Sequence, residues 1–165
     1  MPDIEFRYLL LGGLAIALLI AACTDLRRRQ IDNELNAAIA AAAPLYWWTN
    51  NLALWPDVAW QLGLALVTFA ILAVLFAIRA MGGGDVKLLT ALALWIQPLW
   101  FLRLVVVMAM LGGVLTAVLA GWHLARRRQD RLAIPYGVAI ASAALWVLAA
   151  QHLPNFIASA ANPPG

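Results

Sequence analysis

Two aspartates stand at points where long apolar segments of the chain give way to polar ones. Asp85 follows a run of three glycines at 82–84, and Asp25 comes just before the arginines at 27–29. An ionised side chain inside the hydrocarbon of a membrane costs roughly 2.5 kcal/mol or more, so an acid at such a boundary indicates a functional site. Asp85 alone could equally begin a helix, since acids stabilise helix N-termini and glycine favours the preceding turn. The presence of a second aspartate at such a boundary favours a functional site over a simple helix start.

A pair of carboxylates that lie close together can activate water. Both cannot ionise cheaply, so one holds a proton at neutral pH while the other stays charged. The charged partner can take a proton from a water molecule as that water attacks a peptide carbonyl, and the protonated partner polarises the carbonyl. This is the chemistry of an aspartic protease, and it needs no metal. Because the titration belongs to the pair, neither Asp25 nor Asp85 is assigned permanently as acid or base.

The composition predicts an integral membrane protein in which helices position these aspartates. Of the 165 residues, 65% are hydrophobic and only 12% are charged, and the mean hydropathy of +0.86 is far above that of soluble domains. We expect one all-α domain over residues 1–165, built as a polytopic bundle of about six transmembrane helices. The apolar runs that predict these helices lie near 8–24, 33–48, 58–78, 86–99, 100–124 and 134–153.

The basic residues set the expected orientation of the bundle. Nine of the eleven lysines and arginines fall in or beside the first, third and fifth predicted loops. The positive-inside rule therefore places these loops in the cytoplasm and both termini outside. Asp25 ends the first predicted helix and Asp85 precedes the fourth, so both carboxylates should lie at the cytoplasmic face. Tryptophans near the outer helix ends are interpreted as interface anchors: Trp47, Trp48, Trp55, Trp60, Trp95 and Trp100.

Three motifs, in order along nearly the whole chain, resemble those of the type IV prepilin peptidases, the membrane aspartic proteases of pilus and type II secretion systems. The run at 82–89, which contains Asp85, is similar to their GxGD signature. Asp25, the arginines after it, Ile31 and Asn33 resemble the first aspartate motif, and the segment at 134–141 resembles the one that opens the last helix. The short chain, without paired CxxC motifs, is similar to the minimal enzymes of tight-adherence (Flp-type) pilus systems.

The resemblance implies cleavage of a prepilin leader peptide on the cytoplasmic side of a bacterial inner membrane, with Asp25 and Asp85 as the catalytic pair. The partner would be a prepilin or pseudopilin with a basic leader joined to a hydrophobic helix, which lies in the lipid bilayer. No metal, cofactor or nucleic acid is expected, and a homo-oligomer is compatible with the sequence. Residues expected to bind substrate or shape the site are Gly82, Gly83, Gly84, Lys87, Asn33, Pro135 and Gly137.

Two other functions stay open. The aspartates could relay protons or bind a cation in a small transporter. Alternatively, the chain could be a catalytically inactive assembly subunit of a secretion system, because Asp32 stands where the family usually has proline. Two site residues also have simpler interpretations. Lys87 suits an interfacial lysine that extends to the headgroups, and Asn33 suits the cap of a helix.

Overall fold

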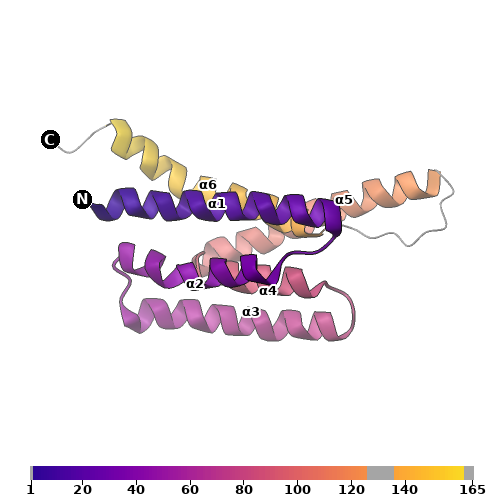
Figure 1. Ribbon diagram of the computed structural model, residues 1–165, viewed down its shortest axis with the longest axis horizontal. Coiled ribbons are helices and arrows are strands. Elements are labelled where there is room, and N and C mark those ends of the chain that lie inside the picture. Colours follow the sequence, from indigo (N-terminus) through magenta and orange to yellow (C-terminus); the bar gives the residue numbers. More distant parts are fainter. Residues whose placement is uncertain (1, 126–135, 162–165) are drawn as a thin grey trace.

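The computed structural model describes residues 2–125 and 136–161, and in these ranges the chain forms helices and connecting loops without strands. Figure 1 shows them as a bundle of roughly parallel and antiparallel rods. The all-α prediction is confirmed, with six helices in the described part of the chain. They are α1 (Pro2–Arg28), α2 (Asn33–Thr49), α3 (Ala59–Ala77), α4 (Gly83–Ala93), α5 (Pro98–Ala125) and α6 (Tyr136–Ala161), and a short π-helical turn, η1 (Leu54–Val58), leads into α3.

Three helical stretches are long and apolar enough to cross a membrane, namely Glu5–Arg28, Leu54–Ala77 and Pro98–Trp122. A shorter apolar helix covers Tyr136–His152. α4 has 11 residues and is therefore roughly 16 Å long, about half the thickness of a hydrocarbon core. It ends at Ala93, six residues before the predicted end of its apolar run at 99.

The short helix α4 lies in the middle of the bundle. It packs against α2, α3 and α6, while α1 packs against α2 and α6, and α5 packs against α6. The side chains of Leu88, Leu89 and Leu92 are at most 1% exposed, so α4 is a core element surrounded by longer helices. The α1–α2 and α3–α4 connections lie toward the same end of the bundle, opposite the start of α1 and the end of α6 (Figure 1).

The tryptophans divide into two groups. Trp48, Trp55 and Trp60 are 69% exposed or more, as expected of interface anchors. Trp95 is only 3% exposed, and its indole N–H donates a 2.8 Å hydrogen bond to the carbonyl of Ile39 in α2. Trp47 likewise donates to the carbonyl of Leu94 at 2.7 Å. The expectation of an interface anchor is therefore wrong for Trp95, which joins the end of α4 to α2.

Candidate active site

Asp25 and Asp85 line the same cavity. Asp25 belongs to the last turns of α1 and Asp85 to the first turn of α4, and the two residues are only 5% and 9% exposed. The cavity has a volume of about 450 Å³ and is otherwise lined by the α1–α2 connection and the glycines at 82–84. A second cavity of about 720 Å³ is also lined by both aspartates, together with the end of α3 and Tyr136 of α6. The structure thus brings together two carboxylates that are 60 positions apart in the sequence.

The three glycines of the site permit close contacts. Gly82 caps α4 in an extended conformation, and a Cβ there would lie 3.0 Å from Oδ2 of Asp85. A Cβ on Gly84 would lie 3.2 Å from Cβ of Ile31 in the α1–α2 connection, and one on Gly83 would meet the ring of Phe76 at 3.2 Å. A larger residue at Gly83 or Gly84 would push α4 away from its neighbours, and one at Gly82 would displace the Asp85 carboxylate. The glycine run therefore leaves room for the Asp85 carboxylate and lets the start of α4 approach α3 and the α1–α2 connection.

The N-terminus of α6 holds the Asp25 carboxylate. The backbone N–H of Val138 donates a 3.3 Å hydrogen bond to Oδ2 of Asp25. The first N–H groups of a helix have no partner within the helix, and the helix dipole favours negative charge there. A Cβ on Gly137 would lie 2.8 Å from Oδ2 of Asp25 and 2.9 Å from Cδ1 of Ile31. Gly137 is thus the residue that allows α6 to approach Asp25.

The environment of Asp85 favours its protonated form. Burial, followed by the nearby charge of Asp25, raises the pKa of Asp85 to about 6, against an opposing hydrogen bond from the backbone of Gly82. A neutral Asp85 can donate a hydrogen bond, whereas a charged Asp25 can accept a proton. The two carboxylates therefore have different surroundings and together can supply a hydrogen-bond donor and a proton acceptor.

Polar side chains of α2 connect the two aspartate segments. Lys87 donates a 2.7 Å hydrogen bond from Nζ to Oδ1 of Asn33, and both side chains are exposed. Asn36, 4% exposed, donates from Nδ2 to the carbonyl of Gly84 at 3.4 Å. The cap of α2 is Asp32 rather than the predicted Asn33. These contacts tie the start of α2 to the first turn of α4.

Several residues of the cavities were not among the predicted site residues. Asp32 lines the smaller cavity together with Asp25 and Asp85, and it makes no side-chain cap hydrogen bond to α2. Arg29 lines both cavities from a left-handed backbone conformation, with φ of 55°. The signal that could have identified both was the charge of the segment between two apolar runs. Predicted site residue Pro135 lies outside the described residues.

The arrangement suits acid–base chemistry on a substrate that reaches the cavity from the surface. Among residues 2–125 and 136–161, no three His, Cys, Asp or Glu side chains are placed to hold a metal ion. The carboxylates alone can supply a proton donor and a proton acceptor.

Comparison with known proteins identifies the chain. A model of the type IV leader peptidase family matches residues 13–121, a range that contains Asp25, Asp85 and the glycine run. No significant match was found among curated proteins or among solved structures. Because the match covers well over half of the 165 residues, the chain belongs to the type IV leader peptidase family.

Proposed function

We propose that this protein is an aspartic-type endopeptidase that cleaves the leader peptide of type IV, Flp-like prepilins at the cytoplasmic face of the bacterial inner membrane. The observation that carries this proposal is the shared cavity of Asp25 and Asp85, whose side chains come from different helices and differ in surroundings. Membership of the leader peptidase family supports a peptidase reaction in general.

In the proposed reaction, the two aspartates act on one water molecule. Charged Asp25, held by the N–H of Val138, takes a proton from the water as its oxygen attacks the scissile carbonyl carbon. Neutral Asp85 donates a hydrogen bond to the carbonyl oxygen, and the C–N bond breaks as a proton reaches the leaving amine. The products are a carboxylic acid on the leader, which then loses its proton to water, and a free amine on the mature pilin, and the pair returns to its singly protonated state.

The bilayer would help to align the substrate. A prepilin with a basic leader and an apolar helix keeps the helix in lipid and the leader in the cytoplasm, which fixes the depth of the scissile bond near the membrane surface. Restricting the substrate in this way lowers the entropic cost of reaching the reactive geometry. Lys87 and Asn33, which are hydrogen-bonded at the cavity's edge, are proposed to contact the substrate beside the junction.

Incubation of the purified full-length protein with a type IV prepilin in liposomes tests the proposal. Release of the leader, measured as a mass decrease and a new N-terminus on the pilin, is expected. Only prepilin whose leader lies on the membrane face that carries the α1–α2 and α3–α4 connections should lose its leader. A folded protein that releases no leader but conducts protons across the same liposomes would instead support the transporter alternative. A protein that does neither would fit the inactive assembly subunit.

A further inference from the structure

Arg29 places a positive charge beside the two aspartates. It lines the cavity of about 450 Å³ and also the one of about 720 Å³, the two cavities that contain Asp25 and Asp85. Within the part of the chain that the structure describes, Arg29 is the only cationic residue in the lining of the smaller cavity, which holds three carboxylates. Its charge interacts favourably with that of Asp25. Arg29 is exposed, so a ligand that enters either cavity from the surface can reach it.

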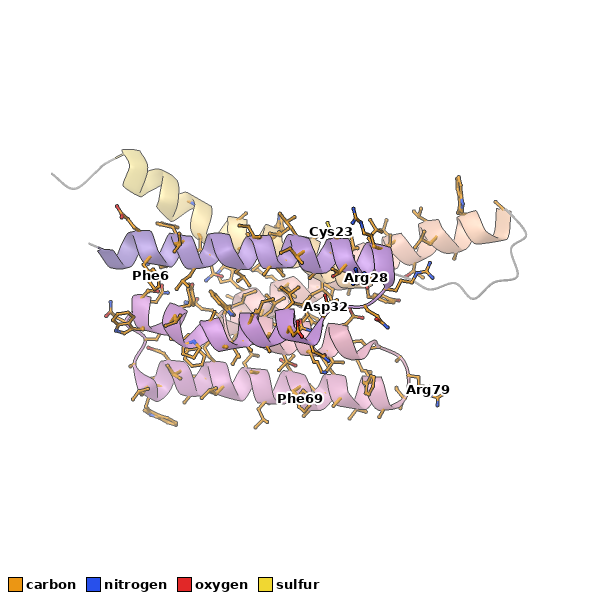
Figure 2. All side chains as sticks on the ribbon, in the orientation of Figure 1. Phe6, Cys23, Arg28, Asp32, Phe69 and Arg79 are labelled. Atoms are coloured by element: carbon orange, nitrogen blue, oxygen red, sulfur yellow. The ribbon has the colours of Figure 1, made fainter. Side chains whose placement is uncertain are left out.

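The backbone of Arg29 has a conformation that glycine adopts more easily. The residue follows α1 with φ of 55°, and its N–H donates a 2.8 Å hydrogen bond to the carbonyl of Asp25, as in left-handed caps at the C-termini of helices. In Figure 2, Arg28 and Asp32 mark the two ends of the connection between α1 and α2, which begins with Arg29. Residues other than glycine are strained in this conformation. Such strain beside a candidate active site points to a role for the side chain.

The proposed reaction creates a negative charge close to the charges that are already there. Cleavage leaves a carboxylic acid at the new C-terminus of the leader, and this group ionises at neutral pH. A carboxylate beside charged Asp25 is disfavoured by the repulsion of like charges. A guanidinium offsets this repulsion, since it can donate two parallel hydrogen bonds to one carboxylate.

We propose that Arg29 binds the carboxylate at the new C-terminus of the released leader, so that the aspartate cavities form a product site as well as a reaction site. This proposal rests on the proposed function and extends it from the bond that breaks to the product that forms. The intact peptide carries no charge at that carbon, so the ion pair with Arg29 forms only after the C–N bond has broken. Activation of water is left to Asp25 and Asp85.

Binding of leader peptides to the full-length protein in detergent tests the proposal without any cleavage. Two synthetic peptides carry the leader sequence of a type IV prepilin, and one ends in a carboxylate whereas the other ends in a neutral amide. Fluorescence anisotropy at neutral pH gives the Kd of each. The carboxylate peptide should bind about ten-fold more tightly, as expected for one hydrogen-bonded pair of charged groups. Equal affinities, or no binding of either peptide, would overturn the proposal.

Two variants test whether the preference for the carboxylate belongs to Arg29. Arg29→Gln should bind the two peptides equally. Arg28→Gln is the matched control, because Arg28 is the exposed neighbour that lines neither cavity, and it should keep the preference of about ten-fold. A preference that persists in Arg29→Gln, or that is lost to the same extent in Arg28→Gln, would overturn the proposal.

A third variant separates product binding from support of the fold. Glycine is unstrained at the φ of 55° that Arg29 adopts. Arg29→Gly should therefore unfold at the same temperature as the unsubstituted protein or at a higher one, and it should lose the preference for the carboxylate peptide. A preference that persists in folded Arg29→Gly would overturn the proposal. A lower unfolding temperature together with loss of the preference would also overturn it, because Arg29 would then act through the fold.

The same measurements distinguish failure of this proposal from failure of the proposed function. A protein that prefers the carboxylate peptide through Arg29 but never cleaves prepilin would support the leader site and contradict the peptidase activity. A protein that cleaves prepilin but binds the two peptides equally would support the peptidase activity and overturn the leader site.

Discussion

The backbone N–H of Val138 donates a hydrogen bond to the Asp25 carboxylate, which is 113 residues earlier in the chain. The contact joins the start of α6 to the end of α1, two helices that pack along each other. It also directs the N-terminal end of the α6 dipole toward a buried acid, where it stabilises the charged form. Asp85 also lies in the first turn of a helix, α4, but burial and the nearby charge of Asp25 outweigh that position and raise its pKa to about 6.

The first prediction concerns the glycine beside this contact. Gly137→Ala should reduce leader cleavage at least about ten-fold, because a Cβ would lie 2.8 Å from the Asp25 carboxylate and force α6 or Asp25 to move. Gly113→Ala is the control, since a Cβ there meets nothing within 4 Å. Steady-state kinetics, with thermal unfolding to check the fold, would measure the effect. Equal activity of the two variants would show that leader cleavage does not depend on the close approach of α6 to Asp25.

The second prediction is a pH dependence of activity. The proposed reaction uses neutral Asp85, and the pKa of this residue is raised to about 6. Cleavage should therefore decline as the pH rises through about 6. The cleavage rate of a peptide that contains only the leader and the cleavage junction, measured as a function of pH, would test this without effects of pH on a membrane-embedded substrate. Activity that stays constant well above that pH would contradict a role for protonated Asp85.

The third prediction concerns stability. The folded-state pKa of Asp85 is raised from 3.8 to about 6, so the folded protein binds this proton more tightly than the unfolded chain. The stabilising contribution is complete below about pH 4 and is lost as the pH rises through about 6. Asp85→Asn should weaken this dependence in unfolding measurements across that window. An unchanged slope would indicate that Asp85 titrates as an ordinary surface acid.

The fourth prediction compares two polar residues of α2. Asp32 occupies the cap position without making the cap hydrogen bond, so Asp32→Ala should cost less than the roughly 1 kcal/mol typical of a capping residue. Asn36 is buried and hydrogen-bonded to Gly84, so Asn36→Ala should cost about 1 to 3 kcal/mol. Unfolding of both variants in the same detergent would measure the difference. A larger loss for Asp32→Ala would show that its carboxylate supports the fold.

Part of the architecture could be predicted from local patterns. α2 begins at the predicted residue, Asn33, because polar residues there separate two apolar runs. The end of α4 could not be predicted, since the apolar sequence continues through Leu94, Trp95 and Ile96 after the helix stops at Ala93. Hydropathy reports burial, and Trp95 and Ile96 are buried without being helical, while Leu94 is partly buried. Trp95 was misinterpreted as an interface anchor because the partner of its indole N–H, the carbonyl of Ile39, lies on another helix and cannot be read from the local sequence.

The site was predictable only in part. The glycine run and the two aspartates form sequence motifs, and the expected topology placed both acids at one end of the bundle. The hydrogen bond from Val138 to Asp25 depends on how α6 packs against α1, and no local pattern encodes a contact across 113 residues. The hydrogen bond of Asn36 to Gly84 likewise follows from the packing of α2 on α4.

The most direct test of the central claim is leader cleavage by three single variants. Asp25→Asn and Asp85→Asn keep the shape of each side chain and remove one member of the proposed pair, whereas Asp57→Asn changes an exposed acid of η1. Each protein would be purified, checked for folding and incubated with the same prepilin. Loss of cleavage in the first two variants and retention in the third are predicted. Full cleavage by either Asp25→Asn or Asp85→Asn would contradict catalysis by the two aspartates.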